Sequence, residues 1–280
     1  MGIEEYLTAI DDDQFVPGYY WSDMEDLSHE LREMICNIKE ISTVPIAYDA
    51  GSKKKGTMIK DAFDLDIVFY YPNHTKESLE EISTILESAL RTKYSTVYTK
   101  NVSIRIDFPY RNDLAAHNFH VDVVPARKLR SSEDYVWIYR WQEGNVIKSN
   151  VSKHLEAVFS FRRPDILRLL KLWRVRNNCI CPGFILERIT IETIQRIPYY
   201  WRMKKYDLLI EMFQYICKQF PNRKFIADPA DKKRNLIDDN EISAEEKESL
   251  IQSAEYALAQ NLNTIPGWRE IYTRGLNFRA

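Results

Sequence analysis

Residues 51–71 read GSKKKGTMIKDAFDLDIVFYY, and this stretch decides the predicted fold. Its last eight residues, 64–71, alternate and then become continuously apolar, which predicts a β-strand with one end near solvent. Asp64 and Asp66 lie at that end, two residues apart, so their side chains project from the same face. Two neighbouring carboxylates repel each other unless a cation lies between them. The D-x-D spacing therefore predicts a cation site at the strand end.

A third carboxylate is expected to complete this site. Asp122 lies in residues 120–124, HVDVV, a strongly apolar strand in which an unpaired carboxylate would be costly. Oxygen ligands suit Mg²⁺, with Mn²⁺ as the alternative. Asp64, Asp66 and Asp122 are therefore the predicted metal ligands and catalytic residues, able to hold two ions around an in-line displacement. Asp122 could also take the proton from the attacking hydroxyl.

The turn upstream of the aspartates is the predicted phosphate site. Gly51 and Gly56 permit tight turns whose backbone amides can face an anion, and Ser52 adds a hydroxyl donor. The lysines between the glycines are more often solvated than ligands. His120 shares a strand face with Asp122 and is expected to pack or to form hydrogen bonds. The turn, the D-x-D pair and the isolated strand aspartate together are a much stronger signal than any one part.

Strands are expected mainly in the first half of the chain and helices in the second. Residues 22–41 predict a long N-terminal helix that opens with a capping box at Ser22. From about residue 155, apolar residues recur with a helical period. The predicted fold class is α+β and bilobal, with a mixed-sheet catalytic lobe over residues 1–155 and a C-terminal helical lobe over residues 156–280.

The composition is that of a globular protein with a sizeable core, at 45% hydrophobic and 29% charged residues. The formal net charge of −2 argues against a dedicated binder of duplex nucleic acid, whose affinity comes largely from phosphate neutralisation. The four cysteines show neither a zinc-ribbon spacing nor a disulfide framework. With no signal peptide and no long apolar run, the protein is expected to be cytoplasmic, without a membrane partner.

The order GS-x-x-x-GT, D-x-D and HVDVVP resembles the polymerase-beta-like nucleotidyltransferases. Within that superfamily it is most similar to the branch of cyclic GMP–AMP synthase, the 2′-5′ oligoadenylate synthetases and the bacterial CD-NTases. Residues 169–173, LLKLW, resemble the L-L-K-x-W helix, whose lysine contacts the donor triphosphate, and this implies that role for Lys171. Residues 183–187, GFILE, resemble the S-F-x-L-E segment, with Gly183 in place of a phosphate-touching serine. Residues 225–231, FIADPAD, resemble the late D-P-A-D segment.

The resemblance implies a bilobal nucleotidyltransferase that makes a cyclic di- or oligonucleotide second messenger from ATP or other nucleoside triphosphates. It further implies a role in bacterial anti-phage (CBASS) signalling, in which the product acts on a separate effector protein. The animal sensors of this branch carry a zinc-bearing insertion or a broad basic face for duplex nucleic acid. This chain has neither a cysteine-histidine cluster nor a positive net charge, so no obligatory nucleic acid is expected.

Two other functions remain open from the sequence. A nucleotidyltransferase could instead add nucleotides to a tRNA end or to a protein. Basic groups suited to RNA occur at residues 162–163, 204–205 and 232–234, although each is more often an ordinary solvated surface. An inactive relative that only binds nucleotides is the least favoured reading, because it would have no chemical reason to keep three carboxylates together.

Overall fold

The computed structural model describes residues 1–108, 119–238 and 240–273, and the chain divides into two compact units. The sheet unit comprises residues 16–155, and the helical unit comprises residues 156–280 together with residues 1–15. The sequence groups the first 15 residues with the strand-rich lobe. In the structure they form α1, which packs on α7, α9 and α11 of the helical unit.

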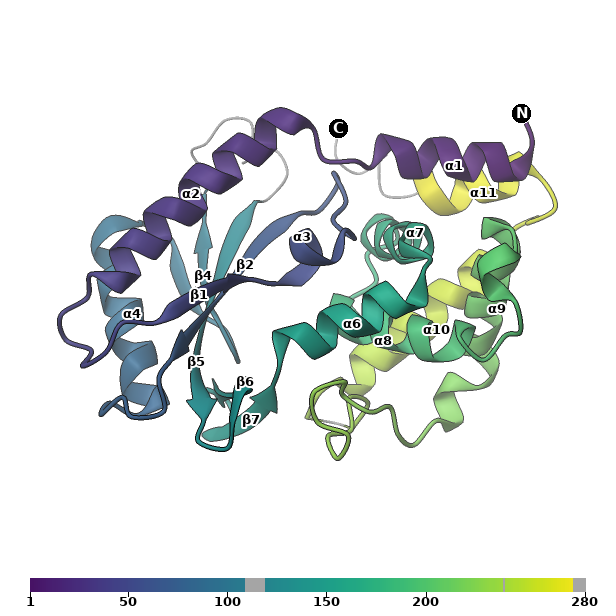
Figure 1. The fold of residues 1–280 in the computed structure, drawn as a ribbon. Coiled ribbons are helices and arrows are strands. Elements are labelled where there is room, and N and C mark those ends of the chain that lie inside the picture. Colours follow the sequence, from purple (N-terminus) through teal and green to yellow (C-terminus); the bar gives the residue numbers. More distant parts are fainter. Residues whose placement is uncertain (109–118, 239, 274–280) are drawn as a thin grey trace. The chain divides into compact units, whose positions relative to one another are not determined.

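The sheet unit is built on a mixed sheet (Figure 1). Its strands run in the order β1-β2-β5-β4-β3. β6 extends it by pairing with β5, and β7 pairs with β6. β2 and β5 are parallel to each other, whereas the other neighbours are antiparallel. The strands are β1 Ile46–Asp49, β2 Asp64–Tyr71, β3 Val97–Thr99, β4 Ile104–Asp107, β5 His120–Leu129, β6 Ser132–Arg140 and β7 Asn145–Ser149.

Two helices, α2 (Gly18–Cys36) and α4 (Leu79–Lys93), supply the apolar cover of one face of this sheet. Their buried leucines and isoleucines form one core with alternate residues of the central strands. In β2 the core residues are the odd-numbered ones, from Leu65 to Tyr71. Because strand side chains alternate between faces, the even-numbered residues Asp64 and Asp66 project from the opposite face.

The N-terminal helix of the sheet unit, α2, lies earlier in the chain than predicted. It begins at Gly18, directly after Pro17, so Ser22 is an internal helix residue and the predicted capping box is wrong. The helix ends at Cys36 rather than at residue 41, and Asn37 is its C-cap, with its side chain donating to the Glu33 carbonyl at 2.8 Å. The residues from 37 to 41 continue the apolar spacing that is typical of a helix, but they are not helical.

The helical unit contains the part of the chain in which helical periodicity was expected. Ser243 accepts a hydrogen bond from the N–H of Glu246 and thereby caps the N-terminus of α10. The elements are α1 Ile3–Asp13, α6 Val151–Phe161 (which spans the unit boundary), α7 Pro164–Arg176, α8 Gly183–Ile194, η1 Tyr200–Arg202, α9 Lys205–Lys218, η2 Phe220–Asn222, α10 Ala244–Leu258 and α11 Ile265–Thr273.

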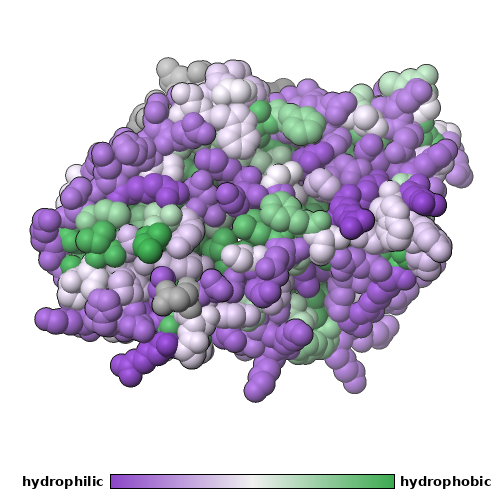
Figure 2. Space-filling model, in the orientation of Figure 1, coloured by the Kyte–Doolittle hydropathy of each residue, from purple (hydrophilic) through white to green (hydrophobic). Residues whose placement is uncertain are grey.

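Hydrophilic residues cover most of the face shown in Figure 2, and apolar patches interrupt them only locally. In the helical unit, Trp173 and Trp268 are fully buried. Among the described residues, none of the helices is both long enough and apolar enough to cross a bilayer.

A buried ion pair fixes α1 to α7. Arg168 donates from Nε and Nη2 to the two carboxylate oxygens of Asp11, at 2.7 Å each, and both side chains are at most 10% exposed. Removing one partner leaves the other charge buried without compensation, which typically costs 3–5 kcal/mol. We expect Asp11→Ala to lower the free energy of unfolding in urea by about 3 kcal/mol. Asp12→Ala, the exposed neighbour, should change it by less than about 0.5 kcal/mol, and equal losses would contradict the assignment.

Candidate active site

The parallel pairing of β2 with β5 brings the predicted metal ligands together. In this register Asp66 is opposite Asp122, and Asp64 is opposite His120. The intervening residues of both strands are buried in the core that α2 and α4 cover. The carboxylates therefore all project from the other face of the sheet, at the same end of the two strands.

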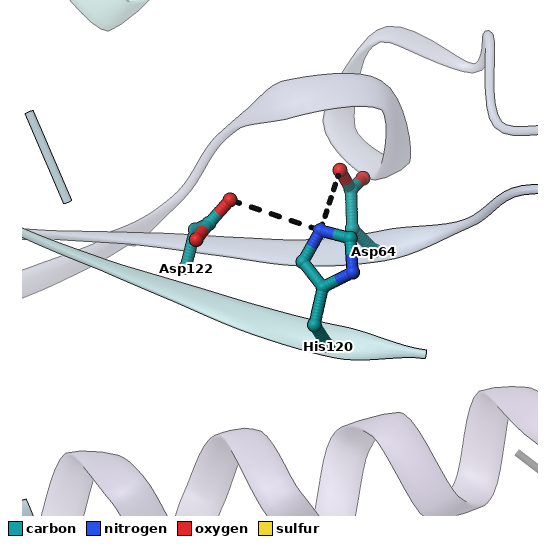
Figure 3. Close-up of side chains that lie close together, drawn as sticks. All are labelled: Asp64, His120 and Asp122. Carbon is teal, nitrogen blue, oxygen red and sulfur yellow. Dashed lines mark ion pairs between the residues drawn. The ribbon is translucent and has the colours of Figure 1, made fainter. Parts of the chain in front are cut away.

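The imidazole of His120 lies between two of the carboxylates (Figure 3). Its Nε2 atom is 3.5 Å from Asp64 Oδ2 and 3.8 Å from Asp122 Oδ2. One potential ligand atom from each of these three residues lies within 4.8 Å of the others. The structure thus joins Asp64, His120 and Asp122 in a group that could hold a metal ion, with Asp66 as the next outward-facing residue of β2.

The charges of this group shift the pKa values of its members. Burial raises the pKa of Asp66 well above its ordinary value, and the charges of Asp64 and Asp122 raise it further, against the opposing effects of Lys55 and His120. Burial lowers the pKa of His120, but the hydrogen bond and charge of Asp64 outweigh it, and the net shift is upward. Without a metal, Asp66 and His120 therefore hold their protons more tightly than isolated side chains of the same type do, because neighbouring carboxylates surround them.

Asp66 packs against the glycine-serine turn. Gly51 has a φ of +60°, and a Cβ atom at this position would lie 1.5 Å from Asp66 Oδ2. The Ala50 N–H donates to the Asp66 carbonyl at 2.9 Å, and Ser52 Oγ donates to Asp64 Oδ1 at 3.3 Å. The turn therefore contacts both aspartates of the D-x-D pair, and only glycine leaves room for the Asp66 carboxylate.

The predicted turn contains one unforeseen element, the short helix α3 (Gly51–Lys55). Gly56 ends it in the left-handed conformation, with a φ of +66°, and its N–H donates to the Lys53 carbonyl at 3.3 Å. Both glycines thus adopt the positive φ for which their residue type was singled out. Lys55 belongs to the electrostatic environment of Asp66, whereas Lys53 lies 3.9 Å from Asp49.

Asp122 has two partners that the sequence did not reveal. Arg105 of β4, its cross-strand neighbour, donates from Nε to Oδ1 at 3.1 Å and from Nη2 to Oδ2 at 2.7 Å. Ser103 Oγ donates to Oδ1 at 3.2 Å. Burial lowers the pKa of Arg105, but the hydrogen bonds and charge of Asp122 outweigh it and the net shift is upward. The sequence contains one indication of this contact. Ile104 and Ile106 belong to the core, so the side chain of Arg105 between them must face away from it.

Arg105 is the counter-charge of Asp122 in the metal-free protein, and its removal gives a testable result. We expect Arg105→Ala to lower the free energy of unfolding by about 2 kcal/mol, below the usual range for a buried pair because Arg105 is 28% exposed. Added Mg²⁺ should stabilise this variant more than the wild type, because the cation would balance the negative charge of Asp122 that Arg105 no longer balances. Thermal unfolding with and without Mg²⁺ measures both effects. A variant with wild-type stability and metal response would contradict this role for Arg105.

Lys171 lies on α7 in the helical unit, where its Nζ atom is 3.8 Å from Glu187 Oε2 of α8. The Gly183 position, where relatives of the resembled family carry serine, has room for a side chain. A Cβ atom there would make an ordinary contact of 3.6 Å with Arg174 Nη2. Steric crowding therefore does not explain why position 183 is a glycine rather than a serine.

The residues present suit a hard divalent cation. Three carboxylates supply oxygen ligands, which Mg²⁺ and Mn²⁺ prefer, and their mutual repulsion is relieved by a positive charge. The close approach of Asp64 and Asp122, together with the raised pKa of Asp66, is the arrangement that a divalent cation would stabilise.

Comparison with known proteins identifies the fold. The chain superposes on the CdnC protein of E. coli MS115-1, solved with ATP, with a TM-score of 0.69 at 15% identity, covering 96% of this chain and 97% of that one. It superposes on the CD-NTase CdnG of Bradyrhizobium diazoefficiens, solved with GTP, with a TM-score of 0.71 at 13% identity, covering 98% and 96%. It superposes on the cyclic AMP-GMP synthase DncV of Vibrio cholerae with a TM-score of 0.63 at 13% identity, covering 97% of this chain and 84% of that one. The chain therefore has the bilobal fold of the bacterial CD-NTases, as its motifs predict.

Matches at the level of sequence are weaker. No family model matches the chain. A CCA-adding enzyme of Sulfolobus acidocaldarius is 31% identical over 117 residues, covering 41% of this chain and 25% of that protein. A CCA-adding enzyme of Methanocaldococcus jannaschii is 24% identical over 241 residues, which cover 76% of this chain and 51% of that protein. The chain thus spans between a quarter and a half of the length of these two relatives.

Proposed function

We propose that this chain is a Mg²⁺-dependent nucleotidyltransferase that makes a cyclic di- or oligonucleotide from nucleoside triphosphates. The observation that carries the proposal is the carboxylate group on paired strands β2 and β5, within a fold shared along nearly its whole length with cyclic-nucleotide synthases. In this proposal the product activates a separate effector protein in bacterial anti-phage signalling. The protein would work in the cytoplasm and need no nucleic acid for activity.

Each predicted residue has a chemical role in this proposal. Asp64, Asp66 and Asp122 would hold the metal. Two bound Mg²⁺ ions would polarise the reacting phosphate and increase the acidity of the attacking hydroxyl. Asp122 is the proposed proton acceptor, and the fork of Arg105 fixes the orientation of its carboxylate.

Phosphate binding is assigned to two places in the chain. The backbone of Gly51 and the hydroxyl of Ser52 would bind triphosphate oxygens next to the carboxylates that they contact. Lys171 would bind the donor triphosphate from the helical unit. We therefore assign catalysis and one part of phosphate binding to the sheet unit, and the other part of nucleotide binding to the helical unit.

The test is incubation of the purified protein with labelled ATP, GTP, CTP and UTP and Mg²⁺, without nucleic acid. We expect products that resist phosphatase, because a cyclic product has no terminal phosphate, and chelation of the metal should abolish them. Linear, phosphatase-sensitive products would instead identify an oligonucleotide synthetase. No consumption of any triphosphate would contradict the proposed function.

The similarity to two CCA-adding enzymes favours a second candidate, transfer of nucleotides to a tRNA end. Adding unlabelled tRNA to the same incubation separates the two functions. Transfer of label to the tRNA, with no cyclic product in its absence, would support this candidate. The same carboxylates would serve either acceptor, so mutations in the metal site do not distinguish them.

A further inference from the structure

The connection between α8 and α9 presents aromatic and cationic side chains to solvent. Residues 196–206 read RIPYYWRMKKY and contain no acidic residue. Tyr199 is 64% exposed and Trp201 is 47% exposed. Arg202 and Lys204, which follow directly, are also exposed. Large exposed aromatic side chains gathered in one segment mark a binding surface more often than isolated ones do.

The framework of the helical unit holds this segment in place. Tyr200, between the two exposed aromatics, is buried and stacks on Phe161 with ring centroids 5.5 Å apart and planes within 10°. Arg163 donates from Nη1 to the carbonyls of Tyr200 and Met203, at 3.3 and 2.8 Å. Its Nε and Nη2 atoms bind the carboxylate of Asp165 at the start of α7. The exposed aromatic residues therefore project from a fixed turn.

The backbone of this turn is strained at Tyr199, which has a φ of +57°. Residues with a Cβ atom rarely adopt this left-handed conformation, and a bulky side chain there is a genuine outlier. Strain of this kind persists where the surrounding structure imposes it, and it is concentrated at functional positions. Here it accompanies a turn that buries Tyr200 and leaves both neighbouring aromatic rings exposed.

The cations of the segment lie close to its aromatic rings. The guanidinium of Arg202 is 6.0 Å from the centroid of the Tyr199 ring, and the ammonium of Lys204 is 5.5 Å from that of Tyr206. Within the described part of the chain, neither Arg202 nor Lys204 has a carboxylate within 4.0 Å. Lys205 differs, because it lies 3.7 Å from Glu4 and 3.9 Å from Asp165. Two cations are thus available to an anionic partner beside the rings.

We propose that residues 199–204 form a binding site for single-stranded nucleic acid, in which bases stack on Tyr199 and Trp201 and phosphates pair with Arg202 and Lys204. Exposed aromatics interleaved with cations are the recurring means of binding single strands, because every base has a face that can stack. A duplex keeps its bases stacked internally, and the net charge of −2 offers no broad basic surface for its phosphates. This proposal does not rest on the proposed function, since binding is measured without nucleoside triphosphates.

The test is fluorescence anisotropy of labelled 12-nucleotide oligo(U) and oligo(dT) with the full chain. We expect binding that Tyr199→Ala with Trp201→Ala weakens about tenfold or more. Arg202→Ala with Lys204→Ala should weaken binding and flatten its salt dependence. The control is Tyr98→Ala, which removes an aromatic side chain that is 47% exposed on β3 of the sheet unit and should bind like the wild type.

Tyr199→Gly separates binding from folding. Glycine adopts a positive φ without strain, so this variant should be at least as stable to heat as the wild type and yet bind the oligonucleotide more weakly. Absence of binding by the wild type would overturn the proposal. So would unchanged binding by the aromatic double variant, or equal affinity for a 12-base-pair duplex, since each result would exclude base stacking.

Discussion

Alanine at both Asp64 and Asp66 is expected to abolish nucleotide transfer and to leave the fold intact. The two side chains lie on the face of β2 opposite its core, so their removal takes no apolar contact from the sheet. Metal ions contribute several kcal/mol of transition-state stabilisation, which corresponds to a loss of at least about a thousandfold in rate. Product formation from labelled nucleoside triphosphates measures the loss, and circular dichroism checks the fold.

The control for this double variant is Asp134→Ala, which removes an exposed carboxylate from β6 of the same sheet and should keep full activity. Retained turnover in the double variant would remove the metal-site assignment. An unfolded double variant would contradict the separation of the site from the core.

The single variant Asp66→Asn is expected to change how the unfolding free energy depends on pH. Replacing a residue that does not titrate would leave that dependence unchanged. The folded-state pKa of Asp66 is raised above the unfolded value of about 3.9, so the folded state binds the proton more tightly. Its contribution to stability is therefore fully present below that pH and is lost as pH rises through the raised pKa. Asparagine does not titrate. In metal-free buffer, the unfolding free energy of the variant minus that of the wild type should therefore increase with pH over this range.

The main features of the site could be predicted because strand periodicity is local. Two aspartates two residues apart in a strand share a face whichever strand lies beside it. The residues HVDVV predict a second strand with one carboxylate that faces away from the core. That these strands are parallel neighbours, with Asp66 opposite Asp122, is a long-range fact that periodicity does not provide, because periodicity could place Asp122 in the site only if its strand lay beside the first. The CD-NTase fold was expected from the order of motifs.

The missed features depend on contacts between distant parts of the chain. Arg105 reaches Asp122 only through the register of β4 against β5, which no local pattern specifies. Residues 1–15 join the helical unit because Asp11 meets Arg168, far along the chain. The start of α2 was misplaced because Ser22 and Glu25 fit a capping box that the preceding Pro17 makes unnecessary.

Gly51→Ala is expected to lower nucleotide transfer by about a hundredfold or more, with only a modest loss of stability. A Cβ atom at position 51 would meet Asp66 Oδ2 at 1.5 Å. The atom that must move is the end of a side chain, so the least costly relief is rotation of the Asp66 carboxylate out of the group. Displacing a catalytic group by about 1 Å can cost about a hundredfold in rate. The predicted defect is therefore weaker metal binding and slower turnover in a folded protein.

Gly56→Ala is the matched control for this substitution. Gly56 has a φ of +66°, close to the +60° of Gly51, but a Cβ atom there would have nothing within 4 Å. Both variants should lose about 1–2 kcal/mol of stability, because each forces alanine into a left-handed conformation. Only Gly51→Ala should lose activity and the thermal stabilisation by Mg²⁺. If the two variants were equally impaired in turnover, backbone strain in the turn would explain the effect, and the contact between Gly51 and Asp66 would have no special role.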